Sequence, residues 1–360
     1  MYEEDLDFLR CPKTKSPLRV AAVSVRGRDG EILEGELAGP AGNYPVTNGI
    51  PRFIKDISYN ESWDFKWRVL DGGRAFNYRI IDKNDPAYAI HDIFDRNDHG
   101  GLAYRHAQGR IVLDAGCGIG QYSVKLAQLH LPRKIVSVDL TAGVDIFRRV
   151  LLKRYPTLIR RFLLVQASVF ELPFLEDSFD YVFSLGVLMH TGDTLKALDN
   201  VLRLLRDGGE ANIWLYCSEP VAYDAVEPNR GSVLTVNNIR PFLRRTRVAM
   251  FWIHLFRRVS HGMALSILRF FSSDSIYRLS RVRGFRWIRS VFPMVEHPDP
   301  GYRLINHYDG YVNNWCDTWA EHEIFPTLRK NDIAILGMSG WRLGIWGKKD
   351  KRLYRSTDKN

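Results

Sequence analysis

The chain has 360 residues and a net charge of +10, with 45% hydrophobic and 26% charged residues, a composition typical of a globular protein with a large core. The acidic start MYEEDLDF and uncharged apolar stretches of at most about ten residues predict neither a secretory signal nor a membrane-spanning helix, which needs roughly 20. Four scattered cysteines suit a reducing compartment, so we expect a cytoplasmic protein without disulfides.

Residues 1–56 read as a small N-terminal domain. The outline LRCPKTKSPL followed by GNYPVTNGIPRFI resembles a zinc-ribbon-derived domain that C-P-x-C opens and Y-P-x-x-x-G-I-P closes. Here Cys11 is present, but Thr14 stands where the second thiolate would be. A structural zinc site needs four ligands. We therefore expect a degenerate domain and no metal.

Residues 57–110 are predicted to be a linker and an N-terminal cap in front of the first core strand. Aromatic side chains are dense here, at Trp63, Phe65, Trp67 and Phe76. Two interpretations stay open, because these rings could fold over a ligand or could simply fill a core.

The strongest motif is VLDAGCGIG at 112–120. A short apolar strand over 111–113 leads to three glycines at alternate positions, and the spacing of apolar residues predicts a helix over 121–129. Such a turn lets a ligand lie against backbone N–H groups at a helix start. The third glycine comes one residue too early for the dinucleotide fingerprint G-x-G-x-x-G. The alternative is a tight turn of any doubly wound sheet.

Further strands follow at the expected spacing. KIVSVDL at 134–140 contains Asp139, a carboxylate placed to bind a ribose diol or simply an exposed acid at a strand end. Strands are also predicted over 163–165 and 179–185, and over 211–216 after a turn at Gly208 and Gly209.

Taken in order, these blocks resemble the class I S-adenosylmethionine-dependent methyltransferases of the small-molecule, methyltransferase-11-like type. The resemblance implies an α/β, Rossmann-like seven-stranded sheet with helices on both faces and a core over 111–219. It implies S-adenosyl-L-methionine as cofactor and S-adenosyl-L-homocysteine as product. Relatives usually have Asp where this chain has Ser168, so adenine recognition would rely more on backbone groups. The implied cofactor-binding residues are Asp114, Ala115, Gly116, Cys117, Gly118, Gly120, Asp139, Leu140, Ala167, Ser168, Val169 and Leu185.

Three residues are candidates for contact with the methyl acceptor. A general base helps when the acceptor is a hydroxyl, and the resemblance puts His190, after the fourth strand, on the side of the donor methyl. His190 could equally pack or cap locally. The segment NHYDGYVNNW adds His307 and Tyr308, because a comparable segment borders the substrate cavity in relatives.

Residues 220–316 are predicted to form an arginine-rich helical insertion that caps the substrate. From Arg240 to Ser290 there are twelve arginines, no lysine and one acid, so this segment carries a net charge of +11. Apolar residues at three- and four-residue spacings between the arginines indicate amphipathic helices. Such a face would suit an anionic substrate, a membrane surface or nucleic acid, or it would be solvated. The lack of lysine favours bidentate contacts with phosphate or carboxylate.

The chain is expected to end with a helix interrupted at Pro326 and a closing pair of strands over 317–348, followed by a tail over 349–360. The function predicted from the whole sequence is methyl transfer to an oxygen or nitrogen of a small or carrier-bound metabolite. GVLMH in place of an N-P-P-Y type sequence counts against methylation of a base nitrogen. The alternatives are an RNA methyltransferase and a non-catalytic, methyltransferase-like binding protein. The acceptor and the oligomeric state stay open.

Overall fold

The computed structural model describes residues 1–54, 61–70, 102–216, 248, 250–292, 294, 299–312, 317–339 and 343–353. The chain divides into two compact units. The first comprises Met1–Asn60, Arg79–Glu219 and Asp317–Asn360, and the second comprises Glu61–Tyr78 and Pro220–Cys316. Parts of the predicted cap at 57–110, of the insertion and of the tail lie outside the described residues.

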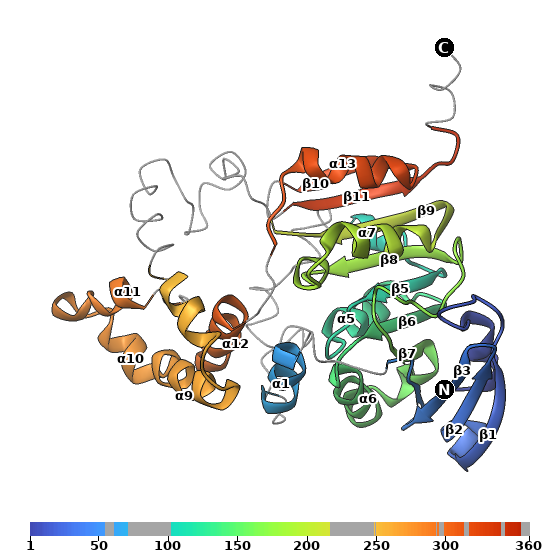
Figure 1. The fold of residues 1–360 in the computed structure, drawn as a ribbon, viewed down its shortest axis with the longest axis horizontal. Coiled ribbons are helices and arrows are strands. Elements are labelled where there is room, and N and C mark those ends of the chain that lie inside the picture. The colour runs from blue at the N-terminus through green and yellow to red at the C-terminus, as the bar shows by residue number, and fades with distance from the viewer. Residues whose placement is uncertain are drawn as a thin grey trace. The chain divides into compact units, whose positions relative to one another are not determined.

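The first unit is built on a seven-stranded mixed sheet (Figure 1). β5 to β9 run parallel to one another, and β11 pairs antiparallel with both β9 and β10. In spatial order the strands are β10 (Ile333–Ser339), β11 (Gly344–Lys349), β9 (Leu205–Trp214), β8 (Phe179–Leu185), β5 (Ile111–Ala115), β6 (Lys134–Asp139) and β7 (Phe162–Gln166). This is the Rossmann-like α/β fold expected from the sequence, with its closing antiparallel pair.

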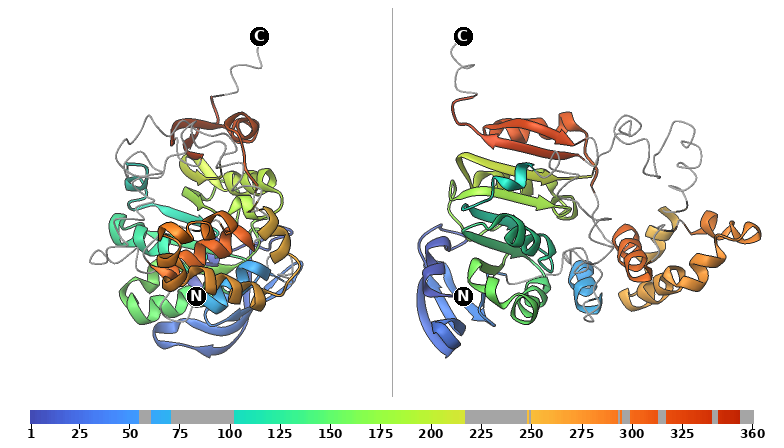
Figure 2. Two further views of the ribbon diagram at one scale, coloured as in Figure 1. Left: turned by 90° about the vertical axis from the view of Figure 1, so that its left-hand side faces the viewer. Right: turned by 180° about the vertical axis from the view of Figure 1, so that it is seen from behind.

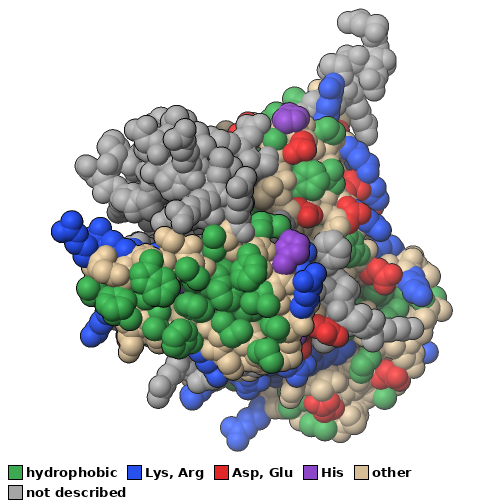
Figure 3. Space-filling model, turned by 60° about the vertical axis from the view of Figure 1, so that its left-hand side comes forward, with side chains coloured by type: hydrophobic (Ala, Val, Ile, Leu, Met, Phe, Trp, Pro, Cys, Tyr) green, Lys and Arg blue, Asp and Glu red, His purple; other side chains and the backbone are tan. Residues whose placement is uncertain are grey.

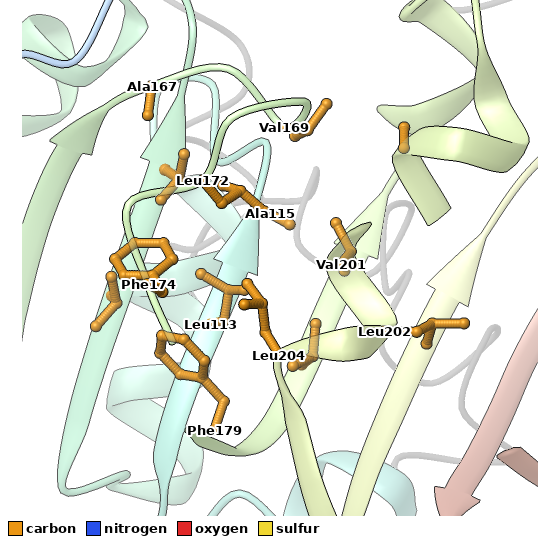
Figure 4. Close-up of a cluster of buried hydrophobic side chains, with 14 of the residues drawn as sticks. Leu113, Ala115, Ala167, Val169, Leu172, Phe174, Phe179, Val201, Leu202 and Leu204 are labelled. Carbon is orange, nitrogen blue, oxygen red and sulfur yellow. The ribbon is translucent and has the colours of Figure 1, made fainter. Parts of the chain in front are cut away.

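Helices cover both faces of this sheet. Alternate strand residues point to opposite sides, and the buried side chains on each side pack against helices. On one face Leu113 and Ala115 share a core with α7 and α13, and Figure 4 shows Leu113, Phe174, Phe179 and Leu204 gathered there. On the other face Asp114 contacts Ser123 of α5. The helices of this unit are η1 (Glu3–Phe8), η2 (Arg28–Gly30), α4 (Leu102–Arg105), α5 (Gln121–His130), α6 (Gly143–Arg154), η5 (Pro156–Arg161), η6 (Leu188–His190), α7 (Thr194–Arg203) and α13 (Glu321–Lys330).

The N-terminal residues form a second, antiparallel sheet in the order β1 (Arg19–Arg26), β2 (Ile32–Gly39), β3 (Gly42–Thr47) and β4 (Ile50–Pro51). Figure 2 shows these strands beside the β7 edge of the large sheet. Their buried side chains, Leu37 and Val46 among them, belong to the same hydrophobic core as β6 and β7. The segment is therefore part of the same compact unit as the seven-stranded sheet.

Two local expectations were wrong. Gly208 and Gly209 do not precede the strand but lie inside β9, where a register shift against β8 and the positive φ of Gly208 (75°) accommodate them. Pro326 does not interrupt α13, because the helix is anchored by buried Ile324 and Leu328 on either side of it.

The second unit is helical in the parts that the structure describes. Its core is aromatic, with the rings of Phe271 and Phe292 stacked 4.1 Å apart and surrounded by Phe256 and Tyr311. A helical segment over 250–256 precedes α9. The labelled helices are α1 (Glu61–Leu70), α9 (His261–Ser272), α10 (Asp274–Leu279), η9 (Arg283–Phe285), α11 (Ile288–Val291) and α12 (Pro300–Tyr311).

Candidate functional site

The glycine loop between β5 and α5 has a backbone that only glycine adopts without strain. Gly116, Gly118 and Gly120 have φ values of 96°, 52° and 82°. There is also no room for side chains at two of them. A Cβ on Gly116 would lie 2.2 Å from Val187, and one on Gly120 would lie 2.2 Å from the ring of Phe147. Glycine at these positions therefore lets the backbone turn tightly against Val187 and Phe147.

Asp139 at the end of β6 binds directly to this loop. Its Oδ2 accepts a hydrogen bond of 2.7 Å from the backbone N–H of Gly118. Its Oδ1 accepts bonds from the backbone N–H (2.9 Å) and the hydroxyl (2.6 Å) of Thr141. These three bonds fix the carboxylate at the carboxyl edge of the parallel strands, where ligands bind in sheets of this kind.

Asp114 lies beneath the loop, fully enclosed. Its Oδ2 accepts a 2.6 Å hydrogen bond from the hydroxyl of Ser123, which lies 2.9 Å from the hydroxyl of Ser137. Burial raises the pKa of Asp114 to about 8; the charge of Asp139 adds to this rise, and the bond from Ser123 opposes it. Asp114 is thus a buried acid that a nearby cation would help to ionise.

A buried polar atom at the start of α5 is a second indication of a ligand site. Gln121 is buried, and its Oε1 accepts no hydrogen bond from any part of the protein that the structure describes. A buried carbonyl oxygen without a donor is costly. A donor group on a ligand lying in the loop would remove that cost, so these residues fit a bound polar cofactor.

The residues expected at the adenine end lie beside this loop, after β7. The backbone N–H of Ala167 donates to the carbonyl of Asp139 at 3.1 Å, and the side-chain amide of Gln166 donates to the carbonyl of Leu140 at 3.0 Å. The hydroxyl of Ser168 accepts a 3.2 Å bond from the backbone N–H of Phe170, while the carbonyl of Val169 accepts from Asn200. Ser168 thus shapes its own turn.

Two further predicted residues pack around the loop. Cys117 is buried, and burial raises the pKa of its thiol well above the ordinary value, as expected of a packing residue. Leu185 is buried at the end of β8. Its neighbour Ser184 donates a 2.7 Å hydrogen bond to the carbonyl of Ala115, which ties β8 to the glycine loop.

His190 lies in η6, just beyond the carboxyl end of β8. Its ring is buried and meets the ring of Tyr216 edge to face, with centroids 5.5 Å apart. Tyr216 in turn packs against Trp214 at the end of β9. His190 therefore stands at the same edge of the sheet as the glycine loop, and its role as a base stays a prediction.

His307 and Tyr308 lie in α12 of the second unit, fully buried in its core. His307 Nδ1 is 2.8 Å from the hydroxyl of Ser272, and Tyr308 bonds His261 at 3.0 Å. Burial, with the charge of Arg303, lowers the pKa of His307 to about 4. Both side chains hold this unit together, and an acceptor contact by either stays a prediction.

Sequence reasoning did not single out Gln121, Ser123, Ser137 or Thr141. For Thr141 the sequence did hold a signal, because a threonine two residues after the strand-end Asp139 is placed to hydrogen-bond that carboxylate locally. Phe65, one of the clustered aromatics, stacks on His261 within the second unit, which supports the core-filling interpretation for this ring. Cys11 lies 3.3 Å from the hydroxyl of Tyr44, and the described residues contain no group of three metal-ligating side chains.

Known proteins that are similar to this chain include methyltransferases. Residues 113–213 match the family model described as a methyltransferase domain. A dimethylglycine N-methyltransferase of Parasynechococcus marenigrum is 33% identical over 51% of this chain and 64% of its own length. A tRNA U34 carboxymethyltransferase of Campylobacter curvus is 32% identical over 28% and 33% of the two chains. An O-methyltransferase of Pyrenophora dematioidea is 29% identical over 30% and 40%. The chain thus spans less than two thirds of the length of each of these relatives.

Proposed function

We propose that this protein transfers a methyl group from S-adenosylmethionine to an oxygen or nitrogen of a small or carrier-bound metabolite, since residues 113–213 match the family model of a methyltransferase domain. The observation that carries the proposal is the bond between Asp139 and the Gly118 N–H. It joins a strand-end carboxylate to a loop whose alternate residues are glycines.

The residues of the loop fit the cofactor by their chemistry. When bound, S-adenosylmethionine supplies a methyl group on a sulfonium, which is open to in-line attack. Asp139 would accept hydrogen bonds from the ribose, Gln121 Oε1 would accept from a donor of the ligand, and Asp114 would be ionised by the ligand's positive charge. The adenine would lie against the backbone groups of Ala167, Ser168 and Val169.

His190 is the residue that we propose as the general base for the methyl acceptor. It stands after β8 at the same edge of the sheet as the loop, and its ring is held by Tyr216. A histidine so placed would take the proton of a hydroxyl as the new bond forms, or would deprotonate an ammonium group beforehand so that its nitrogen lone pair can attack. General-base assistance of this kind contributes about 10²- to 10⁴-fold.

The names of relatives favour a metabolite as acceptor, since two of them denote N- and O-methyltransferases. A third acts on a tRNA uridine by its name, and the arginine-rich segment would suit RNA. An RNA substrate is therefore the second candidate. Affinity for RNA that falls steeply with salt would favour it.

Calorimetry with S-adenosylmethionine and S-adenosylhomocysteine tests the proposal. We expect micromolar binding of both, followed by methyl transfer when candidate acceptors are screened with a labelled donor. The absence of binding at millimolar ligand would refute the enzyme and leave a methyltransferase-like binding protein. Binding without transfer to any metabolite, but with transfer to RNA, would select the second candidate.

A further inference from the structure

The second unit exposes large apolar side chains on its surface. In the described part of this unit they include Met263 and Phe270 on α9, which are 55% and 58% exposed, and Trp287, which is 59% exposed. Figure 3 shows hydrophobic side chains gathered over one face of these helices, with Lys and Arg at the edges. The exposed apolar residues between 250 and 291 are Met250, Phe251, Met263, Phe270, Val282, Phe285, Trp287 and Val291. Extended apolar faces of this kind mark interaction sites.

Arginines are interleaved with these apolar residues. The sequence RVRGFRW at 281–287 is exposed at every position, so three arginines alternate with Val282, Phe285 and Trp287. Between 250 and 292 there are eight arginines, and the one acid is Asp274. Asp274 is itself bound by Arg303 at 2.6 Å. The face therefore combines apolar side chains with a positive charge that this segment does not neutralise.

α9 places its residues as an interfacial helix does. Ala264, Leu265 and Leu268 are buried in the unit's core, whereas Met263 and Phe270, two turns apart, point outward. Ser260 caps the helix through a 3.3 Å bond from the Met263 N–H, so the helix start that presents Met263 is fixed. The outward residues are thus held by the fold.

We propose that this face docks on an anionic lipid bilayer surface, with Met263, Phe270, Phe285 and Trp287 in the headgroup boundary and the arginines on lipid phosphates. Aromatic and aliphatic side chains flanked by arginine are what interfacial segments use. RNA is the less suitable partner, because nucleic-acid interfaces are more polar than this face. No helix in the described residues could cross a membrane, so the contact would be peripheral.

Co-flotation of the full chain with vesicles tests this without any methyl donor. Vesicles of phosphatidylcholine with about 30% phosphatidylglycerol should carry the protein, and vesicles of phosphatidylcholine alone should not. The double substitution Phe270→Ser with Trp287→Ser should lower the affinity at least about tenfold. Arg283→Glu with Arg286→Glu should do the same, and added salt should weaken the binding of the unsubstituted protein.

Matched controls lie on the first unit. Leu152→Ser with Leu353→Ser removes two other exposed apolar side chains, and Arg28→Glu with Arg352→Glu makes the same change of net charge. Both controls should float like the unsubstituted protein, and all variants should keep its melting temperature.

Four results would overturn the proposal: no flotation, equal flotation with both kinds of vesicle, equal losses in the controls, or self-association that Phe270→Ser with Trp287→Ser abolishes. Binding to RNA but not to vesicles, lost in Arg283→Glu with Arg286→Glu and untouched by the apolar substitutions, would assign the face to nucleic acid instead.

Discussion

The carboxylate of Asp139 accepts a 2.7 Å hydrogen bond from the backbone N–H of Gly118. One side chain thereby joins the end of β6 to the loop that follows β5. Thr141 bonds the other carboxylate oxygen, so the group is oriented from both sides before any ligand arrives. Preorganisation of this kind lowers the entropy lost on binding.

Asp139→Ala should therefore weaken the binding of S-adenosylhomocysteine by about 10- to 100-fold, since it removes charge-assisted bonds worth about 1.5–3 kcal/mol each. Calorimetry measures the change in Kd. Asp350→Ala, just after β11 and half-buried, is the matched control and should bind normally. An unchanged Kd for Asp139→Ala would remove Asp139 from the cofactor site.

Alanine at Gly116 or Gly120 should destabilise the fold by about 2–5 kcal/mol. The backbone strain of a positive φ costs about 1–2 kcal/mol, and crowding against Val187 or Phe147 adds about 1–3 kcal/mol. Denaturant unfolding followed by circular dichroism gives the change in the free energy of unfolding.

Gly208→Ala is the matched control for this steric argument. Gly208 also has a positive φ, of 75°, but a Cβ there would meet nothing within 4 Å. It should cost about 1–2 kcal/mol from strain alone. Val187→Ala should restore part of the stability lost in Gly116→Ala. Equal losses at Gly116 and Gly208, with no restoration, would disprove the crowding.

The parts of the fold that rest on local patterns could be predicted from the sequence. The apolar run ending at Leu185 predicts β8 with its observed bounds, and the glycines before Gln121 predict the start of α5. Buried parallel strands are nearly continuous apolar runs, so their signal is strong. Asp139 could be placed for the same reason, because it ends such a run.

Features that depend on distant partners could not be predicted. Gly208 has the sequence pattern of a turn residue, yet it lies inside β9, which pairs with β8 through a register shift. The role of Ser123 depends on Asp114 and Ser137, which reach it from two different strands. His307 follows a stretch of mixed polarity, and only the packing of α12 on α9 makes it a buried neighbour of Ser272.

The stability of the protein should fall as pH rises because of Asp114. Its folded pKa of about 8 lies above the ordinary value of 3.8, so the folded state holds the proton more tightly than the unfolded state. The contribution is fully present below about pH 4 and is lost as pH rises through about 8. Between pH 6 and 9 the unsubstituted protein should lose about 3 kcal/mol more than Asp114→Asn, measured by denaturant unfolding at each pH.

Ser123→Ala checks the origin of this slope. It removes the hydroxyl that stabilises the ionised carboxylate but leaves the carboxyl in place. The pH dependence should persist in this variant and reach further into the alkaline range. If Asp114→Asn kept the full slope, the titrating group would lie elsewhere.

Arg52 should fasten the N-terminal sheet to the core. Its guanidinium donates to both carboxylate oxygens of Asp145 in α6, at 2.9 and 2.6 Å, and to Gln166 in β7 at 2.7 Å. Arg52→Ala should cost about 2–3 kcal/mol, since it leaves a largely buried carboxylate without its partner. Arg52→Lys should recover little of this, because an ammonium cannot make the two-pronged contact. Recovery in the lysine variant would show that charge alone suffices.

His190→Phe separates a catalytic role from a packing role. Phenylalanine keeps an aromatic ring against Tyr216 but cannot take a proton. If His190 is the base, the variant should keep the melting temperature and the affinity for S-adenosylhomocysteine. Its turnover with an acceptor found by screening should fall about 10²- to 10⁴-fold, with loss of the rise in rate with pH that reports the base. Normal turnover in His190→Phe, together with lowered stability in His190→Ala, would leave His190 as a packing residue. The base would then have to come from another group near the glycine loop or from the acceptor itself.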